Sequence, residues 1–139
     1  MDRAQALVKD ASFVKTKALP AEAAAVYSDG LDLGALSSRG VRLVDCELLI
    51  QAPALAVADL ADAATMTYAV QMDNDSAFGS PTTILPSVIV QTGAGGAGAA
   101  AASIRLRLPS NCERYVRVSA TNSAAGEARD KSMTVSLLF

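Results

Sequence analysis

The glycine-rich run Gly93-Ala94-Gly95-Gly96-Ala97-Gly98 is the sharpest chemical motif in this chain and matches the pattern G-x-G-x-x-G. That pattern binds dinucleotides when it joins a buried strand to a helix, because the helix amino terminus then faces the pyrophosphate. An apolar run at 88–90 precedes it, but residues 104–108 already alternate with a period of two, which leaves no room for the helix. We therefore interpret residues 93–102 as a flexible loop or hairpin connector, and we expect no nucleotide cofactor.

Acidic residues could bind calcium or work in pairs as hydrolytic carboxylates. Asp73-Asn74-Asp75 begins like a calcium loop, but Ala77 takes the next ligand position and Phe78 stands where a glycine is needed. We predict a solvated turn there and no metal. A glycosidase needs two paired carboxylates, and nothing in the sequence indicates that Asp59 or Asp62 is buried or paired with an aspartate of the turn.

The chain contains no histidine, which removes the usual general base near neutral pH. Neither a Ser-His-Asp triad nor a Cys-His pair can be assembled. The cysteines, Cys46 and Cys112, therefore lack a histidine to help complete a zinc site. We interpret them as structural thiols, with a disulfide and metal or redox chemistry as the alternatives. The sequence predicts a protein that is not an enzyme, with no catalytic residues, cofactor or metal.

Arginines alternate with apolar residues in two consecutive segments. Arg105 and Arg107 share one face of the first segment, and Arg114 and Arg117 lie in the second, where Arg117 points away from the inward valines. An ordinary charged solvent face explains this pattern. The alternative is a basic patch that meets an acidic protein surface, because the planar, multi-donor side chain of arginine is favoured at interfaces.

The overall charge excludes two classes of partner. The formal net charge is -2 and the pI is near 5.0, so the chain lacks the basic excess with which proteins bind nucleic acid or anionic membranes. Charged residues interrupt each apolar run near the amino terminus, and no stretch approaches the roughly 18 uncharged apolar residues of a membrane span. We expect no export signal, no nucleic acid and no membrane.

Alternating apolar residues predict the strands that position these side chains. Residues 65–72 alternate cleanly, which places Met66, Tyr68, Val70 and Met72 on a face that we expect to be core. The other strand signals, separated by turn-forming residues, lie at 31–34, 41–50, 85–92, 103–108, 114–120 and 133–139. Such short strands predict an all-β fold, an antiparallel β-sandwich or jelly roll. The alanine-rich segment 52–64 is either a loop or one short helix.

Residues 1–28 follow neither the 3.6-residue period of a helix nor the two-residue period of a strand for long. We interpret them as an irregular N-terminal arm before a β-sandwich domain at 29–139. The apolar residues of the arm must cover some surface, either its own sandwich or a neighbouring subunit. The candidate interface residues are Phe13, Val26 and Tyr27 in the arm and Arg105 and Arg107 on the sheet. If the arm binds a neighbour, deletion of residues 1–26 leaves a folded body that attaches poorly.

In their order and spacing, three stretches resemble the cement (decoration) proteins of tailed-phage capsids, the jelly-roll family of the Bordetella-phage type. They are Ala4–Leu7 in the arm leading to Asp29–Gly34, Tyr68–Gln71 followed by Asp73–Phe78, and Glu113–Val118 before the terminal strand. The resemblance implies a virion protein, made in the host cytoplasm, that binds the outer surface of an HK97-like head. It also implies that the protein bridges major capsid protein subunits and so stabilises the shell.

The expected partner is therefore the major capsid protein, and we expect a homo-oligomer, with a dimer favoured over a trimer. The alternative function, from another class, is a small lectin-like or adhesin-like β-sandwich that binds carbohydrate. Aromatic residues make up only 4% of the chain and tryptophan is absent, which counts against a sugar-stacking site.

Overall fold

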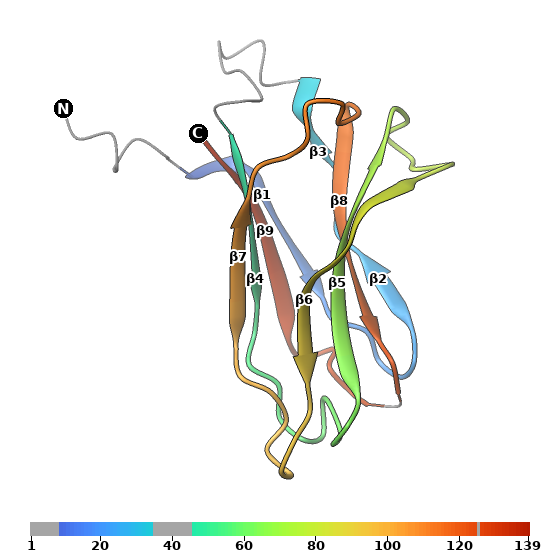
Figure 1. Cartoon of the computed structure of the whole chain (residues 1–139), viewed down its shortest axis with the longest axis vertical. Helices are drawn as coiled ribbons and strands as arrows, with labels where there is room; N and C mark the ends of the chain where they lie inside the picture. The colour runs from blue at the N-terminus through green and yellow to red at the C-terminus, as the bar shows by residue number, and fades with distance from the viewer. Residues whose placement is uncertain (1–8, 35–45, 125) are drawn as a thin grey trace, which may run out of the picture.

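Two antiparallel sheets packed face to face make up the part of the protein that the computed structural model describes, residues 9–34, 46–124 and 126–139 (Figure 1). The predicted all-β sandwich is confirmed. The strands in these residues are β1 (Lys9–Ala18), β2 (Ala25–Tyr27), β3 (Leu31–Asp32), β4 (Glu47–Ala52), β5 (Thr65–Asp73), β6 (Thr82–Thr92), β7 (Ala102–Leu106), β8 (Tyr115–Asn122) and β9 (Ser132–Leu138).

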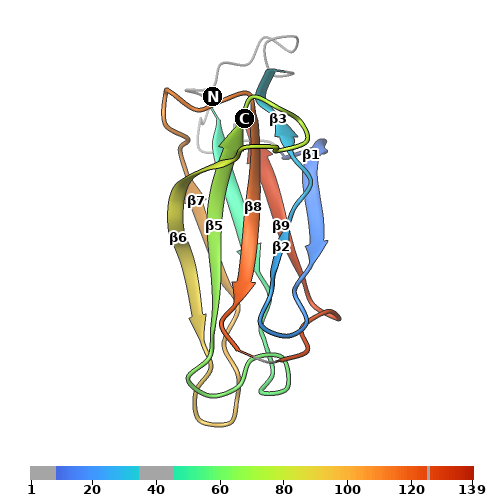
Figure 2. The same cartoon turned by 90° about the vertical axis from the view of Figure 1, so that its right-hand side faces the viewer.

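The first sheet has the strand order β1-β9-β4-β7, and the second has the order β2-β8-β5-β6, with β3 also paired to β8. Every strand pairing in both sheets is antiparallel. Figure 2 shows the second sheet in front of the first. Strands that are neighbours in sequence often lie in different sheets, and β7 and β8 are one such pair.

The core lies between the sheets, where the inward residues of each strand meet. Met66, Tyr68, Val70 and Met72 of β5 are all buried, as their alternation predicts. The Tyr68 hydroxyl donates a hydrogen bond to Gln91 Oε1 at 2.9 Å, which satisfies the only polar atom of that side chain. Burial raises the pKa of Tyr68 above its ordinary value, so the phenol stays protonated.

The expected irregular arm is wrong for residues 9–28. β1 pairs with β9 along the edge of the first sheet, and β2 pairs with β8 in the second. Phe13 and Leu19 are 4% and 1% exposed, so the apolar residues of this segment cover the protein's own sandwich. The sandwich therefore begins before residue 29, and the remainder of the predicted arm, residues 1–8, lies outside the described residues.

The edge position of β1 explains why its sequence does not alternate clearly. Lys15 lies opposite the buried Val135, and Lys17 lies opposite the buried Met133, so both lysines occupy inward positions. At a sheet edge a lysine can lay its aliphatic stem along the core and still extend its ammonium group into water. A register shift between Lys9 and Val14 further breaks the period of two.

The structure decides between the alternatives that the sequence leaves open for residues 52–64 and for the two cysteines. The segment 52–64 is a loop rather than a helix, with a turn in which Asp59 Oδ2 accepts a hydrogen bond from the Ala56 N–H at 2.8 Å. Neither Cys46, which is buried, nor Cys112, which is half-buried, forms a disulfide. Burial raises the pKa of Cys112 to about 11, so it is an uncharged thiol at neutral pH. Of the predicted strand at 41–50, residues 41–45 lie outside the described residues.

The glycine-rich segment 93–102 is not the flexible connector that the sequence suggested. It joins β6 of the second sheet to β7 of the first, and its backbone is hydrogen-bonded to the loop at 53–64. Leu55 and Ala99 exchange two backbone hydrogen bonds of 2.8 Å, and the Gly96 N–H donates to the Asp62 carboxylate at 2.9 Å. Gly98 has a φ of +71° and lies so close to Leu55 that a Cβ atom would overlap the Leu55 carbonyl oxygen.

Gly98→Ala is therefore expected to lower the free energy of unfolding by about 3 kcal/mol or more, because the new methyl group forces two backbone segments apart. Gly95→Ala is the matched control, since Gly95 has a φ of +63° and a Cβ atom added there would meet nothing within 4 Å. It should cost only the roughly 1–2 kcal/mol of a left-handed alanine. Urea unfolding curves measure both changes, and equal losses would mean that the loop is not packed as described.

Candidate interaction surface

The predicted interface residues of the N-terminal segment do not lie together. Phe13 is in the core, where its ring meets the Phe139 ring edge-on at 5.6 Å between centroids. Val26 is half-buried and packs against the same core. Phe13, at 4% exposure, is covered by the protein's own sandwich and has almost no surface left for a partner, whereas Val26 keeps part of its surface and its contact with a partner stays a prediction. Tyr27, by contrast, is 41% exposed on the outer face of the second sheet.

The predicted arginine face is divided between the two sheets. Arg105, on β7 of the first sheet, and Arg107, just after it, are both exposed, as expected. Arg105 Nε pairs with Glu47 Oε2 at 3.1 Å, which reduces the basic character of this side. Arg117 lies on β8 of the second sheet. The arginines at 105–117 therefore do not form a single basic patch.

Arg117 is held between two aromatic rings on the outer face of the second sheet. Its Cζ atom lies 4.0 Å from the centroid of the Tyr27 ring and 4.4 Å from that of the Phe78 ring. Its Nε–H donates to Gln71 Oε1 at 2.9 Å. The described residues make no hydrogen bond to its Nη atoms. The guanidinium group is thus fixed in orientation and keeps donors for a partner.

The loop between β5 and β6 places Phe78 in this stack. Asp73 begins the loop, and its carboxylate accepts hydrogen bonds from the backbone N–H groups of Asp75 at 2.9 Å and Ser80 at 3.0 Å. The predicted turn is confirmed, and the Asp73 carboxylate stabilises it through these hydrogen bonds. Phe78 has a φ of +52°, which is costly for a bulky residue, and its ring lies against Gly30, where a Cβ atom would be only 2.8 Å from the ring.

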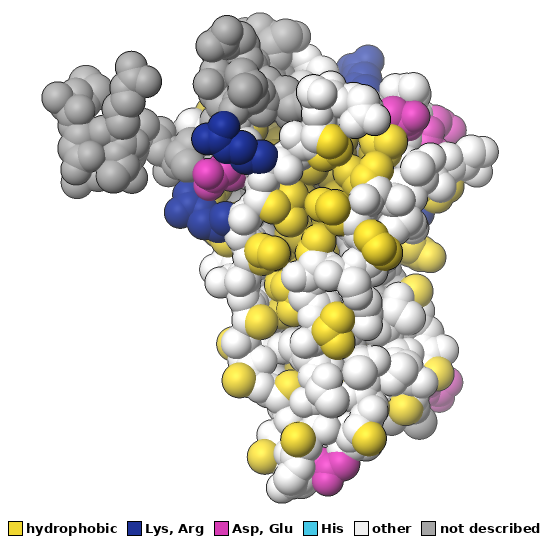
Figure 3. Space-filling view, viewed as in Figure 1, with side chains coloured by type: hydrophobic (Ala, Val, Ile, Leu, Met, Phe, Trp, Pro, Cys, Tyr) yellow, Lys and Arg dark blue, Asp and Glu magenta, His cyan; other side chains and the backbone are white. Residues whose placement is uncertain are grey.

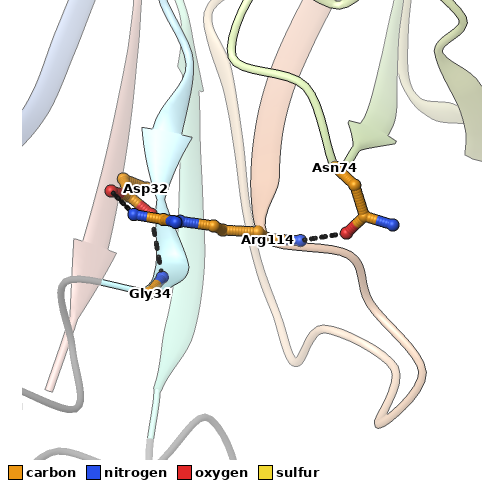
Figure 4. A network of polar contacts seen from close by, with 4 residues as sticks. All are labelled: Asp32, Gly34, Asn74 and Arg114. Carbon is orange, nitrogen blue, oxygen red and sulfur yellow. Dashed lines mark hydrogen bonds and ion pairs between the residues drawn. The ribbon is translucent and has the colours of Figure 1, made fainter.

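A second arginine ties the same end of the sheet together (Figure 4). Arg114 donates from Nε to Asp32 Oδ1 at 2.9 Å and from Nη2 to Oδ2 at 3.1 Å, a bidentate pair. The Gly34 N–H also donates to Asp32 Oδ1, and the Arg114 backbone N–H donates to Asn74 Oδ1 at 3.4 Å. Because this ion pair is exposed, it contributes little to stability, and its main effect is to orient β3, β8 and the β5–β6 loop.

Side chains of these elements form one surface, which we call the arginine–aromatic surface. Its members are Tyr27, Gln71, Arg114, Tyr115 and Arg117, and the ring of Phe78, which is only 9% exposed, packs against Arg117. Tyrosine and arginine are the residue types most enriched where proteins bind one another. Arg114 is already paired with Asp32, so Arg117 is the member that can meet a carboxylate of a partner.

Acid is expected to loosen the β5–β6 loop through Asp73. Hydrogen bonds from the Asp75 and Ser80 backbones, and more weakly the Arg117 charge, hold the pKa of Asp73 below its ordinary value. A carboxyl group whose pKa is depressed by folding stabilises the fold above its unfolded pKa, and this stabilisation is lost as the pH falls through the folded pKa.

The urea midpoint of the wild type should therefore fall as the pH is lowered from about 5 to about 2, and Asp73→Asn should remove part of that fall. Asp130→Asn, at an exposed position, controls for the loss of one carboxylate. An Asp73→Asn variant with the full wild-type pH dependence would show that the Asp73 hydrogen bonds do not stabilise the loop.

A depression of about 240 Å³ lies over the paired ends of β4 and β7 and is lined by Gln51, Ala52, Ala101, Ala102 and Ser103. None of these side chains is ionisable, so this depression offers no acid, base or charged ligand. The described residues contain no group of three or more histidine, cysteine, aspartate or glutamate side chains that could hold a metal ion.

No model of a known protein family matches this chain, and no curated protein matches it either. None of the described segments is a helix long and apolar enough to cross a membrane.

Proposed function

We propose that this protein is a structural capsid decoration (cement) protein that binds the outer surface of an HK97-like phage head and bridges its major capsid protein subunits. The observation that carries the proposal is that the guanidinium group of Arg117 contacts the rings of both Tyr27 and Phe78, while its Nη atoms keep hydrogen-bond donors for a partner. A preorganised arginine loses little freedom on binding, so a carboxylate on the shell would meet a donor already in position. A surface of this kind is suited to binding the capsid shell.

The order of the strands supports this proposal. If β2 and β3, which both pair with β8, are counted as one interrupted strand, the described strands number eight. Renumbered in this way, the sheets have the orders 1-8-3-6 and 2-7-4-5, and we infer from them an eight-stranded jelly roll. The resemblance to jelly-roll cement proteins implies this topology.

Attachment of many copies would stabilise a shell by mass action. A protein that binds the assembled shell and not its separated subunits shifts the equilibrium toward the shell. If each copy touches more than one capsid subunit, modest individual contacts combine into strong overall retention. Strong stabilisation therefore needs no single tight site.

Co-sedimentation with empty expanded capsids of its own virus tests the proposal. We expect the protein to pellet with capsids in a saturable manner and to raise the temperature at which they come apart. A folded protein that stays in the supernatant at all concentrations would refute the proposal. A glycan array run beside it distinguishes the carbohydrate-binding alternative, which predicts specific sugar binding without capsid attachment.

A further inference from the structure

Strand β7 is the last strand of the first sheet, and its inward side chains are incompletely covered. Exposure alternates along residues 102–108, where the half-buried residues are Ala102, Ile104, Leu106 and Leu108 and the exposed ones are Ser103, Arg105 and Arg107. By contrast, Leu48 and Ile50 of β4, which pair with Leu106 and Ile104, are fully buried. Figure 3 shows hydrophobic side chains gathered between β7 and β6, in the upper half of the view. The core is therefore open at the position that a further strand of the first sheet would occupy.

The other edge strands carry features that disfavour a further strand, and β7 does not. On β1, Lys15 and Lys17 occupy inward positions, and an inward charge protects an edge against pairing with another chain. β6 contains Pro86, and its register against β5 shifts on both sides of Val70. β7 contains no proline, its five pairs with β4 run without a shift, and its other edge pairs with no other described strand. β7 is therefore the long edge best suited to accept a strand.

We propose that the free edge of β7 binds an extended segment of a partner protein in which aliphatic and acidic residues alternate. The segment adds a strand to the first sheet, with its backbone hydrogen-bonded to β7. Its aliphatic side chains pack between the sheets, against Ile104 and Leu106 of β7 and Leu85 of β6, all of which now border the core. This site is separate from the arginine–aromatic surface and does not rest on the proposed function.

The charge on the outer face of β7 favours acidic residues in the added strand. Arg105 and Arg107 are the charged residues of the segment 102–108, and both are exposed. Glu47, on the β4 side, pairs with Arg105, so these three side chains together keep one positive charge. Opposite charges on neighbouring strands attract each other and like charges repel. A second copy of β7 would place arginine beside arginine, so the same argument disfavours pairing of β7 with itself.

Binding of labelled synthetic peptides, measured by fluorescence polarisation, tests the proposal. We expect the end-blocked peptide VEVEVEVEV to bind the wild type with a Kd of about 100 µM or lower. The peptide VKVKVKVKV should bind about tenfold more weakly or worse, because its lysines meet arginines. A glutamate peptide with proline in place of the central valine should also bind about tenfold more weakly, because proline removes a backbone donor.

Reversal of one charge on β7 should change the preference between the peptides. Arg105→Glu is expected to weaken binding of the glutamate peptide about fivefold or more and to strengthen binding of the lysine peptide. Arg129→Glu is the matched control, because Arg129 is also an exposed arginine paired with a glutamate but lies between β8 and β9. It should bind both peptides as the wild type does. Both substitutions are at exposed positions, and thermal melting verifies that each variant is folded.

Amide hydrogen exchange locates the bound peptide. The backbone amides of β7 should become more protected when the glutamate peptide is bound, and those of β5 and β8 should not. No binding of this peptide by the wild type at about 1 mM would overturn the proposal, because that affinity is too weak for a specific site. Equal binding of the glutamate and lysine peptides would also overturn it, as would protection confined to the strands around Arg117.

Discussion

Deletion of residues 1–26 is expected to unfold the protein. The deletion removes all of β1 and most of β2, and with them the buried side chains of Phe13 and Leu19. Each such side chain contributes about 1.5–3 kcal/mol by its burial. Loss of β1 also leaves β9, with the buried Val135, as an unprotected edge. The combined cost is comparable to the whole stability of a small domain, about 5–15 kcal/mol.

Thermal melting followed by far-UV circular dichroism measures this effect, and the truncated protein should show no cooperative transition. Deletion of residues 1–8 is the control, because it leaves every described strand intact, and that protein should melt like the full chain. A cooperative melt of the larger truncation near the wild-type temperature would show that β1 is dispensable and that the segment has another role.

Arg117→Ala is expected to weaken attachment to capsids by about 30-fold or more, which corresponds to the roughly 2 kcal/mol of a typical interface hot spot. The variant loses the planar donor group that Tyr27 and Phe78 hold in place. Arg117→Lys keeps the charge but not the planar fork, so it should recover only part of the binding. Co-sedimentation at varied protein concentration gives the affinities.

Arg107→Ala is the control for charge, because Arg107 is an exposed arginine outside the arginine–aromatic surface. It should bind as the wild type does. Thermal melting of each variant separates lost binding from lost folding. A folded Arg117→Ala variant with normal attachment, or a stronger loss from Arg107→Ala, would place the interface elsewhere on the sandwich.

The central strands are predictable from the sequence because both of their neighbours impose alternation. Val70 on β5 and Val118 on β8 are fully buried, and the alternating pattern alone places them inward. β1 is not predictable in the same way. Among the described strands it pairs with β9 alone, and its inward lysines obscure the period of two that burial would otherwise impose.

The candidate surface is predictable only in part. The period of two places Arg117 outward, and Tyr27 is among the interface residues that the sequence predicts. Their contact is not predictable, because it depends on the pairing of β2 with β8, which are far apart in the sequence. In the sequence, Phe78 is only a residue that breaks a calcium loop. Its left-handed conformation, set by the Asp73 turn, brings its ring onto Arg117.

Electron cryo-microscopy of expanded capsids incubated with the purified protein tests the central claim most directly. We predict β-sandwich density on the outer surface of the shell, at sites where capsid subunits meet. The outer face of the second sheet should lie toward the shell, with Arg117 beside an acidic residue of the major capsid protein. Capsids without added density, or with the sandwich attached through the Arg105 and Arg107 side of the first sheet, would contradict the account.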